Sequence, residues 1–275
     1  MGLSGVYEDL LDRVKGLSFE DSLRYIVSLL YPDISRVFEI HKVFLCVQPH
    51  PDDCDLGAGG TVASLTSRGS EVYYLTVTDG RLGTLDRNMY PELLASIRRR
   101  EQEDAAKLLG VKDVYWLDFR DAELSDTLSV RSRIITYIRK LKPSVVLAPD
   151  PYAPYEAHGD HIITGRAALE AVLLSGLPHV NDVDIRSGLE AFTPRFVALY
   201  YTSNPNVFQD ISGTVKVKVE ALLKHESQFK DRALIEFIVG VYATLYGKLS
   251  GLDYAEGFKV IPAELLHVTP FLDRV

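Results

Sequence analysis

The sequence of 275 residues contains only two cysteines, Cys46 and Cys54. Two cysteines exclude a framework of several disulfides and a cysteine-rich zinc module. A chain of this length buries enough apolar surface to fold without a structural metal, so a metal site in it is expected to serve function. Cys46 lies within an apolar run, and we expect it to pack as a small buried apolar side chain.

Long hydrophobic runs are also missing. The longest, Leu234–Tyr246, contains Glu236 and is too short to span a bilayer. The first residues are acidic and have no apolar segment of the kind that signal peptides contain. We therefore expect a soluble, cytoplasmic protein.

Positive charge is in deficit. The chain has 30 Lys and Arg residues against 38 Asp and Glu residues, so its formal net charge is −8. An excess of negative charge disfavours nucleic acid and anionic membrane as principal partners. A small, uncharged ligand is compatible with this balance.

The sequence does contain a regular alternation of strand and helix patterns. Short runs rich in apolar and β-branched residues predict strands, and longer amphipathic stretches between them predict helices. The predicted strands are Val43–Gln48, Glu71–Val77, Val114–Leu117, Ser144–Ala148 and Arg195–Thr202, and the predicted helices are Gly57–Arg68, Pro91–Leu109, Leu128–Leu141, Ile162–Leu174, Val215–Gln228 and Leu234–Tyr246. This alternation predicts an α/β fold with a mainly parallel sheet and helices on both faces.

The alternation changes after Pro178, where a strong strand is followed by two helices and a tail of strand and loop. No linker or internal repeat separates the two parts. We expect residues 1–275 to form a single domain. Its core covers about 40–175, and about 176–275 form a C-terminal α+β elaboration.

A first polar cluster directly follows the first predicted strand; its residues are Gln48, Pro49, His50, Pro51, Asp52 and Asp53. In an open α/β sheet, ligands bind just beyond the carboxyl ends of the strands. The two prolines stiffen the turn and hold His50 extended. Adjacent carboxylates repel each other, and a bound cation is the simplest way to keep both ionised.

A second cluster, His158-Gly159-Asp160-His161, follows the strand Ser144–Ala148 and leads into a helix. Residues three apart at a helix start share a face, so both imidazoles can point into one site. His50, Asp53 and one of these two histidines would form a set of two imidazoles and one carboxylate with open positions. Such a set suits catalytic zinc. Isolated His or Asp residues in loops are more often turn formers. Here, however, His and Asp residues occur together after two different strands, which favours a shared site.

Other classes of protein also fit parts of the pattern. The segment Gly57-Ala58-Gly59-Gly60 is similar to the phosphate-binding turn of dinucleotide-dependent oxidoreductases. However, Val62 stands where that turn needs Gly or Ala. The carboxylates that precede the glycines would also repel the pyrophosphate of the dinucleotide. A non-haem iron oxygenase also uses two His and one carboxylate. A binding protein without catalysis is a third alternative, which the intact set of His and Asp residues disfavours.

Together the motifs resemble the zinc-dependent N-deacetylases of the PIG-L/LmbE superfamily. The matching motifs are PHPDD, GxGGT (Gly57, Gly59, Gly60 and Thr61), TDG (Thr78–Gly80) and HxDH, and the resemblance covers essentially the whole chain. Further segments are similar to the archaeal branch that deacetylates diacetylchitobiose: Tyr115–Leu124, Ala148–His161, His225–Phe229, Tyr254–Pro262 and His267–Phe271. Many family members have Glu where Cys54 stands, and Cys resembles the archaeal branch.

The resemblance implies roles for individual residues. His50, Asp53 and His161 would bind Zn²⁺, Asp52 would be the general base, and His158 would stabilise the oxyanion or protonate the leaving amine. Substrate contacts or orientation of the site would fall to Arg98 and Asp121, and His267 would reach the active site of a neighbouring subunit. Tyr152 offers a surface on which a sugar ring can stack, although packing within its loop explains it equally well.

The resemblance also implies a Rossmann-like sheet, in agreement with the strand and helix pattern. The implied activity is removal of the acetyl group from an N-acetylglucosamine unit, with N,N′-diacetylchitobiose as the first candidate and another conjugate, such as the N-acetylglucosaminyl inositol type, as the alternative. The implied assembly is a homo-oligomer, a trimer or a hexamer.

Overall fold

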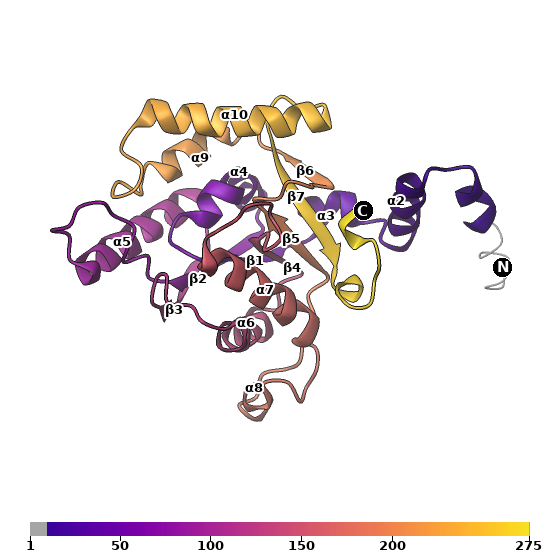
Figure 1. Ribbon diagram of the computed structural model, residues 1–275, viewed down its shortest axis with the longest axis horizontal. Helices are drawn as coiled ribbons and strands as arrows, with labels where there is room; N and C mark the ends of the chain where they lie inside the picture. Colours follow the sequence, from indigo (N-terminus) through magenta and orange to yellow (C-terminus); the bar gives the residue numbers. More distant parts are fainter. Residues whose placement is uncertain (1–9, 275) are drawn as a thin grey trace.

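The computed structural model describes residues 10–274. Seven strands form a mixed sheet in the order β3-β2-β1-β4-β5-β7-β6 (Figure 1). The strands are β1 Val43–Gln48, β2 Glu71–Thr78, β3 Asp113–Phe119, β4 Val145–Pro149, β5 Phe196–Tyr200, β6 Val207–Asp210 and β7 Ala255–Pro262. The strands β1 to β5 are parallel, whereas β7 runs antiparallel to both β5 and β6. The predicted α/β fold with a mainly parallel sheet is confirmed.

Helices cover both faces of the sheet (Figure 1). The helices with described bounds, including those that lie away from the sheet, are α2 Phe19–Leu30, α3 Val37–Ile40, α4 Asp53–Ser67, α5 Pro91–Leu109, α6 Thr127–Leu141, α7 Gly159–Leu174, α8 Asp182–Arg186, α9 Val215–Leu222 and α10 Arg232–Ser250. Successive side chains of a strand point to opposite faces. Accordingly Phe44 of β1 packs in the core layer of α4, α5 and α9, and Leu45 in that of α6 and α7.

Most element boundaries agree with the predicted ranges, and β1 and α5 have the predicted bounds. However, α4 begins at Asp53 and α7 at Gly159, each several residues before its predicted start. Both polar clusters therefore stand at helix N-termini. Neither β6 nor α8 was predicted, because elements of four and five residues are too short to show a periodic pattern.

Cys46 is buried in the apolar core, as expected, but it is not a free side chain, because Cys46 in β1 and Cys54 in α4 form a disulfide. Their Cα atoms are 6.4 Å apart, and both side chains are fully buried in the layer between the sheet and α4. The early start of α4 explains the pairing, since the tight turn after β1 folds the first turn of the helix back beside the strand. The bond tethers α4 to the strand on which it packs.

The helix α10 is longer than the apolar run that predicted it. With 19 residues it is long and apolar enough to cross a bilayer by length and composition alone. Only 22% of its apolar segment is buried inside the protein. Its large exposed apolar side chains are Leu234, Phe237, Val241, Tyr242, Leu245 and Leu249. A helix of a soluble protein can pass the same test, so this property does not assign α10 to a membrane.

We predict that the Cys46–Cys54 bond stabilises the fold against unfolding. A cross-link over a sequence separation of 8 residues removes chain entropy worth about 2.5 kcal/mol from the unfolded state. Denaturant unfolding with and without a reductant should therefore differ by about this free energy. Thiol titration of the unreduced, denatured protein should find no free thiol, and two free thiols per chain would contradict the pairing.

Candidate functional site

The loop between β1 and α4 places three polar residues at the carboxyl edge of the sheet. Its entry is fixed by β2, because the backbone N–H of Thr78 donates to the carbonyl of Pro49 at 2.8 Å. Asp52, the N-cap of α4, has a φ of 104°, in the left-handed region that residues other than glycine seldom adopt. The turn brings Asp53 back toward the loop entry, where its Oδ2 accepts from the backbone N–H of His50 at 2.9 Å.

The second cluster forms the N-terminus of α7, next to this loop. His158 caps the helix, since its Nδ1 accepts from the backbone N–H of Asp160 at 3.3 Å. The ring hydrogen of a neutral His158 therefore lies on Nε2. Burial and the nearby His50 lower the pKa of His158, so the neutral ring is favoured. The ring centroids of His50 and His161 are 5.3 Å apart.

His50, Asp53 and His161 converge as the sequence predicted. The Nδ1 of His50 lies 3.3 Å from Oδ2 of Asp53, and the Nε2 of His161 lies 3.4 Å from Oδ1 of the same carboxylate. Potential ligand atoms of all three residues lie within 4.8 Å of one another. Two imidazoles and a carboxylate at this spacing form a donor set suited to a divalent cation such as zinc.

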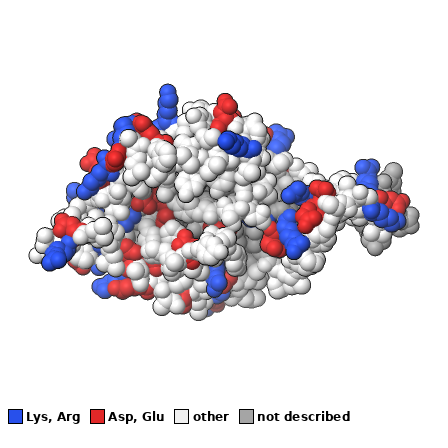
Figure 2. All heavy atoms as spheres, turned by 45° about the horizontal axis from the view of Figure 1, so that its top comes forward, with Lys and Arg blue, Asp and Glu red and all other residues white. Residues whose placement is uncertain are grey.

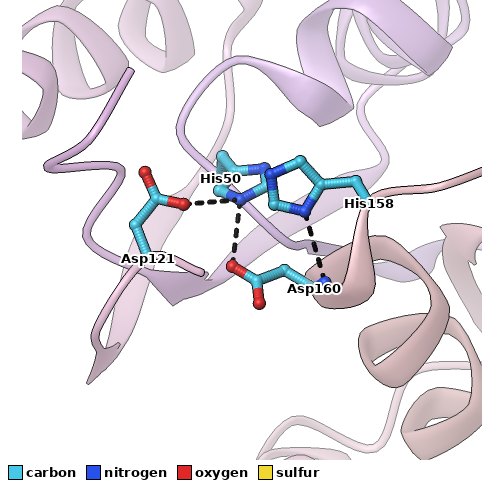
Figure 3. Close-up of side chains that lie close together, drawn as sticks. All are labelled: His50, Asp121, His158 and Asp160. Atoms are coloured by element: carbon cyan, nitrogen blue, oxygen red, sulfur yellow. Dashed lines mark hydrogen bonds and ion pairs between the residues drawn. The ribbon is translucent and has the colours of Figure 1, made fainter. Parts of the chain in front are cut away.

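Two further carboxylates orient the imidazole of His50 (Figure 3). Its Nε2 lies 3.2 Å from Oδ1 of Asp121 and 3.2 Å from Oδ2 of Asp160. A hydrogen held on Nε2 leaves the Nδ1 lone pair facing Asp53, which is how carboxylates commonly orient a ligating histidine. Burial lowers the pKa of His50, but the carboxylates of Asp121, Asp160 and Asp53 outweigh it and raise this pKa to about 11. The shift reflects how strongly these carboxylates favour positive charge at this point.

A second group of potential ligands shares His50 with the first; its members are His50, Asp121, His158 and Asp160. Its two carboxylates already accept backbone hydrogen bonds. Oδ2 of Asp121 accepts from Leu82 at 3.0 Å, and Oδ2 of Asp160 accepts from Ala122 at 2.8 Å. Each of these carboxylates pairs with one imidazole, that of His50, whereas Asp53 pairs with the imidazoles of both His50 and His161.

Asp52 is held from the side of α5 by a buried arginine. The Nη2 of Arg98 donates to Oδ2 of Asp52 at 3.0 Å and to the carbonyl of Pro51 at 2.6 Å, and its Nη1 donates to the carbonyl of Gly80 at 2.9 Å. Burial raises the pKa of Asp52, Arg98 opposes the rise, and the charge of Asp53 adds to it, so the pKa reaches about 6. Asp52 is therefore suited to exchange a proton near neutral pH.

One face of the molecule is hollowed. On the face shown in Figure 2, acidic side chains gather inside a hollow, and lysines and arginines stand mainly on the surrounding surface. A polyanionic ligand would be repelled by such a hollow, whereas a metal ion or a neutral ligand would not.

Arg98 is buried although charged residues surround it in the sequence. The run Arg98–Arg100 has the composition of a solvated, salt-bridged face, yet Arg98 is 4% exposed. The side chain four residues later on the same helix face, Gln102, is fully buried and accepts from the backbone N–H of Asp52 at 2.7 Å. Arg98 and Gln102 share one face of α5, but their spacing alone does not mark this face as a support of the site.

Tyr201 is a further residue that the sequence did not reveal. It directly follows β5 with a φ of 59°, and its hydroxyl donates to the backbone carbonyl of Asp53 at 3.1 Å. Its ring lies nearly parallel to that of His161, with centroids 6.1 Å apart. The sequence predicted only a strand at this position, because a contact between residues 148 positions apart has no local signature.

Two predicted site residues stand apart from the converging side chains. Tyr152 is 68% exposed, on the loop that leads from β4 to His158. His267 is exposed and follows β7, whose last residue, Pro262, pairs with the first residue of β5. That end of β7 lies at the amino edge of the parallel strands, opposite the edge that carries His50. The described structure does not bring His267 into the site of its own chain.

Comparison with known proteins identifies relatives of this chain. Residues 45–172 match the PIG-L family, described as GlcNAc-PI de-N-acetylase. The diacetylchitobiose deacetylase of Thermococcus kodakarensis is 43% identical over 92% of this chain and 96% of its own length. A probable N-acetyl-alpha-D-glucosaminyl L-malate deacetylase 2 of Bacillus cereus is 33% identical over 67% of this chain and 82% of its own.

The fold comparison agrees with the sequence comparison. The structure of the N,N′-diacetylchitobiose deacetylase from Pyrococcus horikoshii, in complex with an inhibitor, superposes with a TM-score of 0.88 and 41% identity. The match covers 94% of this chain and 98% of that one. Both polar clusters of the present chain fall inside the matched family segment, at the ends of β1 and β4. The chain belongs to the PIG-L family of deacetylases.

Proposed function

We propose that this protein is a Zn²⁺-dependent hydrolase that removes the acetyl group from an N-acetylglucosamine unit, with N,N′-diacetylchitobiose as its substrate. One observation carries the proposal. The convergence of His50, Asp53 and His161 beside Asp52 occurs in a chain similar to diacetylchitobiose deacetylases over more than nine-tenths of its length.

The metal would be held by His50, Asp53 and His161. Their donor set fits zinc, and the carboxylates around His50 favour positive charge. A divalent ion held by these residues would supply Lewis-acid polarisation of the acetamide carbonyl and would make water a stronger nucleophile at neutral pH. Asp121 and Asp160 orient the His50 ring through Nε2.

Asp52 acts as the general base. It is adjacent to a proposed ligand, and Arg98 engages its Oδ2, so Oδ1 takes the proton of the attacking water. The water oxygen bonds to the carbonyl carbon, the C–N bond breaks, and the proton passes to the amine nitrogen. Acetate and a free amino sugar are the products. Arg98 thus orients the base, and we assign it no direct contact with the sugar.

His158 stabilises the oxyanion that forms on the acetyl oxygen. Its Nδ1 accepts from the N–H of Asp160, which leaves the Nε2–H of the neutral ring to donate. A neutral His158 is a poor source of the proton for the leaving amine, which favours Asp52 for that step. Tyr152, exposed on the loop before His158, would contact the sugar beyond the reacting group.

We further propose that the enzyme works as a cytoplasmic homo-oligomer, a trimer or a hexamer, in which each whole chain is one catalytic domain. Strands β5 to β7 of the C-terminal elaboration belong to the same sheet as β1 to β4, which supports the single domain. His267 follows the end of β7, which lies at the edge of the sheet opposite the site of its own chain. Its exposed side chain is therefore available to the site of a neighbouring chain.

The first test separates metal binding from proton transfer. Asp52→Asn should keep one Zn²⁺ per chain and lose at least about a hundredfold in kcat, since general bases contribute about 10²–10⁴. His161→Ala should lose the metal. Acetate release and elemental analysis measure the two effects. Near-normal turnover of Asp52→Asn, stoichiometric zinc in His161→Ala, or iron as the bound metal would overturn the assignment.

The second test addresses the substrate. Acetate release should be fastest with N,N′-diacetylchitobiose in a panel that also contains N-acetylglucosamine, longer oligomers, and the malate and inositol conjugates. Comparison of kcat/KM across the panel is the appropriate measure. A conjugate preferred at least tenfold over the disaccharide would refute diacetylchitobiose as the substrate while keeping the deacetylase chemistry.

The third test asks whether His267 acts between chains. His267→Ala and Asp52→Asn should each be nearly inactive alone. Subunits mixed at equal amounts and reassembled should recover about a quarter of the wild-type activity, because half of the sites have an intact Asp52 and half of those receive an intact His267. His179→Ala, which changes another exposed histidine, is the control. A fully active His267→Ala variant or a fully active monomer would contradict the proposal.

A further inference from the structure

A chain of buried polar side chains runs from the catalytic turn to the connection between α9 and α10. Its far end is His225, whose side chain is fully buried. The Nε2 of His225 lies 2.7 Å from Oδ2 of Asp55, which stands in the first turn of α4. Asp55 is fully buried as well, and the hydroxyl of Tyr74 donates to its Oδ1 at 2.9 Å. A buried carboxylate is costly without such partners.

The next member of the chain is Gln102 on α5. Its Nε2 donates to Oδ2 of Asp55 at 2.9 Å, the oxygen that His225 also contacts. Its Oε1 accepts two hydrogen bonds, from Nε2 of Gln48 at 2.9 Å and from the backbone N–H of Asp52 at 2.7 Å. The carboxylate on one side and two donors on the other fix the orientation of this amide.

The backbone at Asp52 needs such support. A φ of 104° is unfavourable for aspartate, and residues in such regions persist only where the surroundings hold them. Arg98 holds the carboxylate and the preceding carbonyl, but the N–H of Asp52 is held by Gln102. Both partners stand one helical turn apart on α5.

We propose that His225 and Gln102 are positioning residues that hold Asp52 in its reactive orientation. The proposal rests on the proposed deacetylase function. His225 acts through Asp55 and Gln102 and has no contact with the proposed metal ligands among the described residues. The competing explanation is structural, namely that His225 only anchors the α9–α10 connection to the core.

Kinetics of two variants distinguish these explanations. Gln102→Met and His225→Leu should lower kcat by about ten- to a hundredfold, as loss of supporting groups around a site commonly does. Their KM and Zn²⁺ content should stay within twofold of wild type. His225→Gln should restore most of the activity, because its side-chain amide can donate to Asp55.

A matched control comes from the same connection. Ser227, two residues after His225, also ties this segment to α5, but through Glu101, with bonds of 2.6 and 2.7 Å. Ser227→Ala should destabilise the segment without changing kcat. If Ser227→Ala and His225→Leu reduce activity only in proportion to the folded fraction, the positioning role is wrong. Loss of zinc together with activity in Gln102→Met would also overturn it.

A readout independent of turnover separates this proposal from the proposed function. Hydrogen exchange of the Asp52 amide, followed by NMR, should be at least tenfold faster in Gln102→Met than in wild type. If the wild-type enzyme were inactive toward every N-acetyl sugar, the proposed function would be refuted, whatever the amide exchange rates of the variants. Faster exchange with unchanged kcat in an active enzyme would refute positioning alone.

Discussion

Repulsion among aspartates removed from water is the constraint on which this site depends. Asp53, Asp55, Asp121 and Asp160 are buried around one end of β1, and Asp52 is nearly so. Carboxylates in a low-dielectric setting stay ionised only beside compensating charge or donors. The chain therefore brings Arg98 from α5, His161 from α7 and His225 from beyond α9 to the same place. Three segments distant in sequence meet because one charge cluster requires them all.

Much of the fold could be predicted because it follows from local patterns. The apolar run of β1 and the helix α5, bounded by Pro91 and Gly110, have their predicted limits because strand length, an N-terminal proline and a C-terminal glycine are all written in the sequence. The starts of α4 and α7 were placed too late. Their first turns contain polar residues, which lack the apolar periodicity from which a helix is predicted.

The residues of the site likewise differ in whether local sequence patterns predict them. His50, Asp53 and one of the two histidines of the second cluster could be predicted to meet because parallel strands place their following loops on one edge, and the family resemblance selected His161. Gln102, His225 and Tyr201 could not, since their contacts join residues far apart in the chain and leave no periodic trace. The Cys46–Cys54 bond escaped notice for a related reason, because it depends on how sharply the chain turns after β1.

The order of the polar chain in sequence has a consequence for biosynthesis. All residues proposed to hold the metal lie before position 162, whereas His225 follows β5 and α9. A chain that emerges from the ribosome N-terminus first exposes these proposed metal-binding loops well before His225, which we propose supports Asp52 through Asp55 and Gln102. The nascent protein would thus be able to acquire its ion before its hydrolytic centre is fixed, so that catalytic competence comes only with the last quarter of the chain.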